Sequence, residues 1–270
     1  NVIITTSATH GLNIAIRSLL GSGDRVVISG YEHNAVTRPL TALKAKVSAA
    51  SGPLFDQEAA IRAFDELIAP GVDVVICNHV SNVFGFVQPV EKVAALCRSR
   101  GVPLIVDEAH GAHFRFSDYF PVSAAQLGAD VVINSVHKTL PCLTQTGVIH
   151  LCSDRVSREK LKRFLGIYQS SSPSYILMSS IDACMDKLER EGDEMFRVFT
   201  ENLEKARRRL SECKYIRLVT PQACECQRVF DFDRSKILLS TVNSSLNGRE
   251  LHQILRREFH LEMEMEAEDY

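Results

Sequence analysis

Two ionisable side chains each follow an apolar run of the sequence. Asp107 ends the run LIVD at 104–107, and Lys138 comes just after the run ADVVINSV at 129–136. Continuous apolar runs are typical of strands buried on both faces, so we expect a buried carboxylate and a buried amine just past two strands. This pair suits pyridoxal 5'-phosphate (PLP), because a lysine amine forms the Schiff base and a carboxylate keeps the pyridine nitrogen protonated.

The segment TTSATHG at 5–11 lies between an expected strand and an expected helix. Hydroxyls and backbone N–H groups at the start of a helix bind anions, and a phosphate is the natural ligand. The residues expected nearest to that phosphate are Ser7, Ala8, Thr9 and His10. Helix capping by Ser7 or Thr9 explains the same segment equally well.

Two further segments place flat or amide side chains after strands. His33, in YEHNAV, has an imidazole that could stack on a flat ring, although a capping or surface histidine is the commoner explanation for such a residue alone. Asn82, in HVSNVFG, could hydrogen-bond a ring hydroxyl. Its alternative role is turn formation together with Gly85.

The segment Asp107-Glu108-Ala109-His110 ends its strand with a carboxylate that needs a partner if it is buried. A protonated pyridine nitrogen would be such a partner, and Ala109 is small enough to let a ring lie against it. A helix cap is one alternative. A metal ligand is another, because His110 and His113 are close by, but we expect no metal.

In the segment Ser135-Val136-His137-Lys138, a lysine with little competing charge nearby would have a lowered pKa, and its neutral amine would be a nucleophile. Ser135 and His137 could hold a phosphate. An ordinary surface lysine is the alternative for Lys138 taken alone. One ligand explains all five polar segments, and this joint fit favours PLP.

Strands alternate with helices in the first half of the chain. Apolar runs predict strands at 2–5, 25–29, 47–50, 72–77, 102–106 and 131–133. Helical periodicity predicts helices at 9–20, 33–43, 56–67 and 89–100. This alternation indicates an α/β fold with a mainly parallel sheet flanked by helices, in which ligands bind beyond the carboxyl ends of the strands.

The pattern changes after residue 154. Two long helices are expected at 174–191 and 193–213, and a further helix at 246–259. Short strands are expected at 216–219, 228–232, 237–240 and 261–265. We therefore expect a large cofactor-binding domain over 1–190 and part of a small α+β C-terminal domain over 191–270.

Composition narrows the class of protein. The 270 residues are 45% hydrophobic and 24% charged, with a formal net charge of −2, which is typical of a soluble globular protein without a nucleic-acid partner. No apolar run approaches the roughly 20 residues that span a bilayer. The eight cysteines suit reduced thiols in a cytoplasmic protein, and Cys224-x-Cys226 is too close for the usual zinc spacing.

The motifs resemble those of fold-type I PLP enzymes, the PLP-dependent transferase-like fold, over nearly the whole chain. Up to about residue 106, TTSATHGLNIAI, EHNAVTRPL and HVSNVFGFVQPV are similar to segments of cysteine desulfurases and class V aminotransferases. From about residue 107, DEAHGAHFRFSDYFPVSAAQLGADVVINSVHKTLPCLTQTG and GRELHQILRREFHLEMEM are similar to the Orn/Lys/Arg decarboxylase group.

This resemblance implies roles for the polar segments. Lys138 would form the Schiff base, Asp107 would bind the pyridine nitrogen and His33 would stack on the ring. The phosphate would be held by Thr9 with His10 and by Ser135 with His137. Asn82 and His110 would lie near the ring oxygen. Both groups begin before the phosphate loop and continue past Tyr270, so we expect a chain that lacks both of those parts.

The implied activity is decarboxylation of a basic amino acid (Lys, Orn or Arg) to an amine and carbon dioxide, by a homodimer or higher homo-oligomer. One alternative is a cysteine desulfurase, lyase or aminotransferase of the same fold. For the desulfurase, only Cys224 and Cys226 are candidates for the mobile catalytic cysteine. The other alternative is a non-catalytic PLP-fold protein or fragment.

Overall fold

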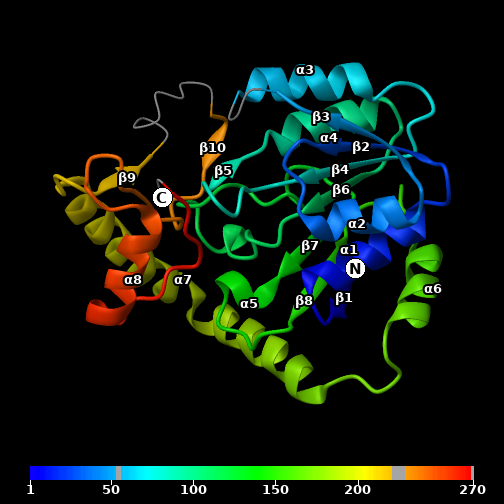
Figure 1. The fold of residues 1–270 in the computed structure, drawn as a ribbon. Coiled ribbons are helices and arrows are strands. Elements are labelled where there is room, and N and C mark those ends of the chain that lie inside the picture. Colours follow the sequence, from blue (N-terminus) through cyan, green and yellow to red (C-terminus); the bar gives the residue numbers. More distant parts are fainter. Residues whose placement is uncertain (53–55, 221–228, 269–270) are drawn as a thin grey trace.

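A seven-stranded sheet with the order β1-β8-β7-β6-β4-β2-β3 forms the centre of the molecule (Figure 1). The computed structural model describes residues 1–52, 56–220 and 229–268. The strands are β1 (Val2–Thr5), β2 (Arg25–Ser29), β3 (Lys46–Ala50), β4 (Val74–Asn78), β6 (Leu104–Asp107), β7 (Val131–Ser135) and β8 (Gly147–Leu151). Strands β3, β2, β4, β6 and β7 run parallel, whereas β8 is antiparallel to both β7 and β1. The expected mainly parallel sheet is confirmed.

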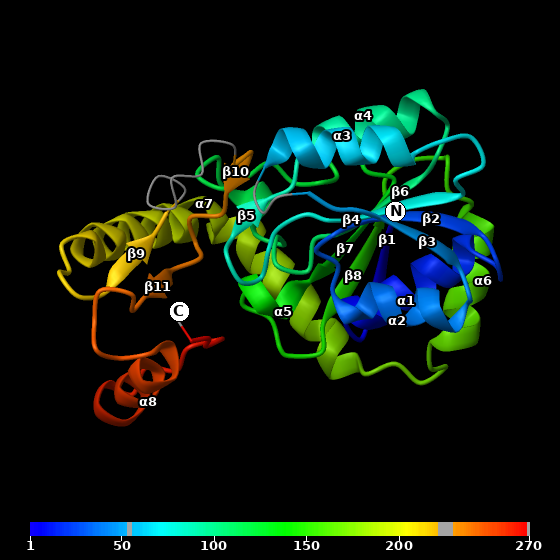
Figure 2. The ribbon, with the colours of Figure 1, turned by 45° about the horizontal axis from the view of Figure 1, so that its top comes forward.

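Helices cover both faces of this sheet (Figure 2). One face packs against α1 (Ala8–Leu19), α2 (Asn34–Ala42) and α6 (Arg158–Tyr168). The other face packs against α3 (Gln57–Leu67) and α4 (Val90–Ser99). In β6, Ile105 points into the first layer, while Leu104 and Val106 point into the second. Burial on both faces explains why this strand is a continuous apolar run.

One long helix, α7 (Tyr175–Ser211), replaces the two helices expected at 174–191 and 193–213, so that prediction was wrong. Buried Leu188 and Phe196 lie on either side of Gly192 along the helix. Packing on both sides therefore outweighs the low helix propensity of glycine. The helix continues through residues 190 and 191, and the division into domains there stays a prediction.

The described residues after α7 form short strands and one helix. Strands β9 (Arg217–Val219) and β11 (Leu238–Ser240) pair with each other, while β10 (Asp231–Phe232) pairs with β5 (Phe86–Val87). These elements and α8 (Gly248–Phe259) lie to one side of the sheet, with α5 (Val136–Thr139) in between (Figures 1 and 2). The β5–β10 pair joins this part of the chain directly to the rest.

The strand expected at 261–265 is absent, so this prediction was also wrong. His260 ends α8 in the left-handed conformation, and the chain then turns back along that helix. The Gly248 N–H donates to the Glu268 carbonyl, and the His252 ring contacts the Glu266 carboxylate. These polar contacts therefore hold the segment along a helix instead of in a strand pair, and Leu261 and Met265 stay about half exposed.

Within the described parts of the chain, no helix has the length and apolar character needed to cross a membrane. The six cysteines found there are all free thiols. Cys224 and Cys226, the pair considered for zinc or for desulfurase chemistry, lie outside the described residues.

Candidate cofactor site

A cavity of about 390 Å³ lies beyond the carboxyl ends of the parallel strands. Its volume falls within the range of about 300–1,000 Å³ that is usual for small-molecule sites. Every predicted cofactor residue except His10 lines it: Ser7, Ala8, Thr9, His33, Asn82, Asp107, Ala109, His110, Ser135, His137 and Lys138. The fold therefore brings the five polar segments of the sequence together around one space.

The start of α1 forms one wall of the cavity. Ser7 caps the helix, because its Oγ accepts a hydrogen bond from the His10 N–H at 3.1 Å. A Cβ atom on Gly147 of β8 would lie only 2.6 Å from the Ser7 carbonyl carbon, so glycine permits this close approach. The His10 ring lies elsewhere: its Nε2 is 3.1 Å from the Tyr168 carbonyl oxygen at the end of α6. The first turn of α1 therefore faces the cavity, whereas the His10 ring does not.

The segment after β2 contributes His33 and an unpredicted carboxyl group, Glu32. His33 is exposed and caps α2, its Nδ1 accepting from the Ala35 N–H at 3.1 Å. Glu32 Oε1 accepts from the Asn78 N–H at 2.6 Å, and its Oε2 is buried without a partner. Burial raises the pKa of Glu32 to about 7, and the nearby Asp107 also raises it. Like Asp107, Glu32 follows a buried strand, and this was the signal available in the sequence.

Asp107 ends β6 and is buried, with 4% of its surface exposed. Its Oδ1 accepts from the Ala109 N–H at 3.0 Å. Burial raises the pKa of Asp107, and the Ala109 N–H, Lys138 and His33 oppose that rise. A buried carboxylate beside a cavity is stabilised by a cationic partner. A protonated pyridine nitrogen would be one, so this side chain fits PLP.

The neighbouring Glu108 does not line the cavity but holds the loop that carries Asp107 and His110. Its Oε1 accepts from the Ala124 N–H at 2.7 Å and lies 2.7 Å from His79 Nδ1. Its Oε2 accepts from Asn134 Nδ2 at 3.0 Å. Sequence reasoning gave Glu108 no role, although strand alternation predicts that it points away from Asp107.

Lys138 lies on α5, and its Nζ is 2.8 Å from His110 Nε2. The expected burial of this amine was wrong: Lys138 is exposed, because it borders the cofactor cavity and a second cavity. The protein around the covered part of the side chain lowers the pKa of Lys138, and Lys236 lowers it further. Asp107 and Glu264 act in the opposite direction and raise it. The neutral, nucleophilic form of this amine is therefore more accessible than that of an ordinary lysine.

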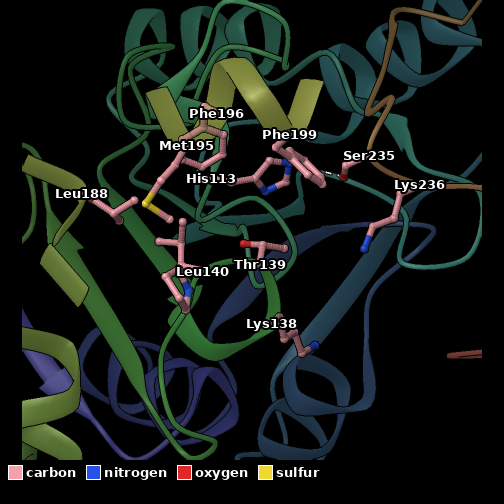
Figure 3. Close-up of a pocket in the computed structure, with 11 residues that line it drawn as sticks. His113, Lys138, Thr139, Leu140, Leu188, Met195, Phe196, Phe199, Ser235 and Lys236 are labelled. Carbon is pink, nitrogen blue, oxygen red and sulfur yellow. Dashed lines mark hydrogen bonds between the residues drawn. The ribbon is translucent and has the colours of Figure 1, made fainter. Parts of the chain in front are cut away.

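The second cavity, of about 470 Å³, has Lys138 and Lys236 on one side (Figure 3). Its other walls are largely apolar and include Leu140, Leu188, Met195, Phe196 and Phe199. Lys236, which comes from the loop between β10 and β11, was not predicted. Its Nζ lies 3.2 Å from His110 Nδ1. Lys236 joins the site through a contact between residues that are 126 positions apart, so no local sequence pattern identifies it.

The remaining predicted residues have partners within the protein. His137 Nδ1 lies 2.9 Å from the Thr146 carbonyl oxygen. The other ring nitrogen, Nε2, takes no part in that contact. Asn82 Nδ2 donates to the Met265 Sδ at 3.7 Å. Over the described residues, no group of three His, Cys, Asp or Glu side chains could hold a metal ion.

Comparison with known proteins places this site in a family context. The family model described as Orn/Lys/Arg decarboxylase, major domain, matches residues 55–239. That match begins upstream of residue 107, within the segment whose motifs resemble those of desulfurases. An arginine decarboxylase of Bacillus subtilis is 28% identical over 93% of this chain and 52% of its own length. A probable cysteine desulfurase of Vibrio cholerae is 30% identical over 51% of this chain and 35% of its own length.

Solved structures share the fold. The lysine decarboxylase LdcF of Francisella novicida superposes with a TM-score of 0.75 at 15% identity, covering 100% of this chain and 45% of that one. An alanine–glyoxylate aminotransferase of Nostoc superposes with a TM-score of 0.72 at 18% identity, covering 97% and 71%. The predicted fold-type I architecture is confirmed. This chain spans about half the length of the arginine decarboxylases of Bacillus subtilis and Halalkalibacterium halodurans that it matches.

Proposed function

Because this chain belongs to the Orn/Lys/Arg decarboxylase family, we propose that it takes part in the PLP-dependent decarboxylation of a basic amino acid. The observation that carries the proposal is the convergence of Asp107, Lys138 and the start of α1 on one cavity of suitable size. The arginine decarboxylases among its relatives support the substrate class. The product would be the corresponding amine, with release of carbon dioxide.

The lining residues suggest how PLP is held. Asp107 would bind the pyridine nitrogen, His33 would lie over the ring and Lys138 would bond to the aldehyde carbon. Ala109 would lie against the ring, and Asn82 and His110 would be near its oxygen. The phosphate would be bound by the first turn of α1 and by the start of α5, through Ser7, Ala8, Thr9, Ser135 and His137. When bound, PLP supplies a ring that takes up the electrons left on Cα as carbon dioxide departs.

The chain's own residues supply the charge and the protons. Asp107 stays ionised opposite a cationic ring nitrogen, because the pair removes the penalty of burying a lone carboxylate. Lys138 Nζ would return a proton to the substrate Cα. His110 Nε2 lies 2.8 Å from this amine, within hydrogen-bond distance for a proton passed between them. Lys138 and His110 would therefore act as the proton-transfer pair of the site.

Glu264 would recognise the cationic end of the substrate. It lines a pocket that shares Asn82 with the cofactor cavity, and its charge raises the pKa of Lys138, so it lies within electrostatic reach of the amine. A carboxylate here complements a guanidinium or ammonium group. Glu264→Gln should raise KM for a basic substrate about tenfold, the equivalent of about 1.4 kcal/mol of binding.

Desulfuration or transamination is the second candidate, and the similarity to probable cysteine desulfurases favours it. Sulfur transfer requires a cysteine beside the substrate. None of the described cysteines lines the cofactor cavity. This supports decarboxylation over desulfuration for the described part of the site.

The test combines cofactor uptake with product analysis. Protein mixed with PLP should absorb in the near-violet, and borohydride should attach the cofactor to Lys138, whereas Lys138→Ala should show neither signal. The loaded protein should then release carbon dioxide and an amine from Arg, Lys or Orn. Sulfide from Cys, or a keto acid from any of these, would move the assignment to the second candidate. A protein that takes up no PLP would overturn both candidates.

We also propose a homodimer or higher homo-oligomer in the cytoplasm. Exposed apolar side chains lie at the start of α7 and the end of α6, among them Ile167, Tyr175 and Ile176. A second copy of the chain would cover such residues. The free cysteines are consistent with a reducing compartment. Light scattering coupled to gel filtration should report at least twice the chain mass of 30.1 kDa, and the mass of one chain would exclude the homo-oligomer.

A further inference from the structure

His110 lies between two lysines that come from distant parts of the chain. Its Nε2 is 2.8 Å from Lys138 Nζ, and its Nδ1 is 3.2 Å from Lys236 Nζ. The His110 ring is buried, with 9% of its surface exposed. Both ring nitrogens therefore have an amine as hydrogen-bond partner, and the imidazole connects the two amines.

Lys236 is held in this position by a braced loop. Its N–H donates to the Asp233 carbonyl at 3.1 Å, and its carbonyl accepts from Arg207 Nη1 at 3.1 Å. Asp233 is itself fully buried, 3.4 Å from His113 Nε2. Gly85 makes room for the stem, since a Cβ there would lie 2.9 Å from the Lys236 Cβ. The loop thus aims the amine at His110 through contacts that do not involve the amine itself.

The chemistry of the groups restricts where protons can be. Burial lowers the pKa of His110 to about 3, with Lys236 and Lys138 adding to this effect, so its imidazole is neutral near pH 7. A neutral imidazole has one N–H and one acceptor nitrogen. An ammonium group can only donate. If both contacts are hydrogen bonds, one lysine donates to His110, and the other must be an uncharged amine that accepts from it.

Of the two lysines, Lys138 lines the cofactor cavity and Lys236 does not, so Lys138 is the amine that we expect to be uncharged. Around Lys138 lie Asp107, Glu264, His110 and Lys236, and the balance of burial and charge lowers its pKa. Asp233 and His33 are the other charged or titratable groups that act on His110. An ammonium on Lys236 can donate to Nδ1, which leaves the proton on Nε2, facing Lys138.

We propose that Lys236 is a positioning residue that holds the His110 proton on Nε2 and thereby keeps the Lys138 amine unprotonated, ready for the aldehyde of PLP. This rests on the proposed function only for the identity of the aldehyde. The arrangement of protons is a property of the protein without cofactor. It gives a role to a lysine that lies beyond the first domain expected from the sequence.

The first test measures the His110 tautomer in cofactor-free protein by long-range ¹H–¹⁵N NMR, with His110→Gln identifying the signal. We expect the Nε2–H form in the native protein and in Lys236→Arg, and a change to the Nδ1–H form in Lys236→Met. Methionine keeps the stem that packs on Gly85 but removes the donor. An unchanged tautomer in Lys236→Met would overturn the proposal.

The second test measures the rate of PLP uptake against pH, again for Lys236→Met and Lys236→Arg. Loss of the donor should raise the pH midpoint of uptake, and a midpoint higher by one pH unit lowers the rate at neutral pH about tenfold. Lys236→Arg should stay near the native midpoint. Lys205→Met, which changes an exposed lysine of α7, is the matched control and should leave the midpoint unchanged. A native midpoint in Lys236→Met would contradict the proposal.

The two measurements separate this inference from the proposed function. Native protein that takes up no PLP would overturn the proposed function, while the tautomer measurement would still decide the role of Lys236. A changed midpoint with an unchanged tautomer would mean that Lys236 acts only through its charge, and the positioning role would be excluded.

Discussion

His79 Nδ1 and Glu108 Oε1 lie 2.7 Å apart in the interior, with 0% and 3% of the two residues exposed. This contact joins the residue after β4 to the residue after β6. It lies beneath the loop that carries Asp107 and His110 toward the cofactor cavity. The geometry of the site therefore depends on a buried polar pair that touches neither substrate nor cofactor.

Glu108→Ala should destabilise the protein by about 3–5 kcal/mol, because removal of one partner leaves the other buried polar groups unpaired. Urea unfolding of the cofactor-free protein measures the loss. Glu91→Ala, an exposed change on α4, is the control and should stay within about 0.5 kcal/mol of the native value. A loss below about 1 kcal/mol for Glu108→Ala would show that this pair contributes little.

Gly147→Ala should weaken PLP binding by about tenfold or more, because the substitution would displace contacts to the phosphate. A loss of about 1.4 kcal/mol of binding free energy corresponds to a tenfold weaker affinity. The added methyl group would lie 2.6 Å from the Ser7 carbonyl carbon and 2.9 Å from the Ala8 nitrogen, and would push back the start of α1. Equilibrium titration of PLP by absorbance measures the affinity. Gly166→Ala meets nothing within 4 Å and serves as the matched control, with native affinity expected.

Asp107→Asn should lower the affinity for PLP by about 10- to 150-fold, the equivalent of the 1.5–3 kcal/mol assigned to a hydrogen bond with a charged partner. The same change removes a buried carboxylate whose pKa is raised by burial, so the cofactor-free protein should be no less stable than the native one. Titration with PLP and thermal unfolding give the two values. Native affinity in the variant would exclude contact between Asp107 and the pyridine nitrogen.

Glu32 should make the cofactor-free protein less stable as pH rises from about 4.5 to about 7. The pKa of Glu32 rises from 4.5 to about 7 on folding, so the folded state holds the proton more tightly. Stability then falls wherever the folded state binds more protons than the unfolded one. Glu32→Gln should remove this dependence and stabilise the protein above pH 7 by at most about 3.4 kcal/mol, since a tenfold change in proton affinity is worth about 1.4 kcal/mol. Parallel pH profiles for native and variant protein would contradict the raised pKa.

Apolar patterning was sufficient to place six strands of the central sheet, whereas α5, which carries Lys138, was not predicted. The predicted strands at 2–5, 25–29, 47–50, 72–77, 102–106 and 131–133 agree with the observed strands within two residues. Parallel strands that are buried on both faces, such as β4, β6 and β7, appear in the sequence as continuous apolar runs. Strand β8 and helix α6 were not predicted. The place of β8 between β1 and β7 depends on pairing across the sheet, which local sequence does not specify.

Predictions from the apolar pattern were wrong where the local conformational preference of the sequence and the tertiary packing disagree. Gly192 suggested a break between two helices, yet the apolar residues on either side hold α7 as one helix. The segment 261–265 has strand-like alternation, yet it folds back on α8, where the Gly248 N–H donates to the Glu268 carbonyl. In both places tertiary contacts outweigh propensities worth at most about 1 kcal/mol per residue.

The sequence by itself determined the fold class, six of the strands of the central sheet, and the positions of Asp107 and Lys138 just after apolar runs. It did so because burial on both faces and helix periodicity are local properties of the chain. Only the tertiary structure decided that His10 turns toward α6, that Lys138 is exposed, and that Glu32 and Lys236 join the site. These depend on the direction of side chains and on contacts across as many as 158 residues, which arise only when the whole chain has packed.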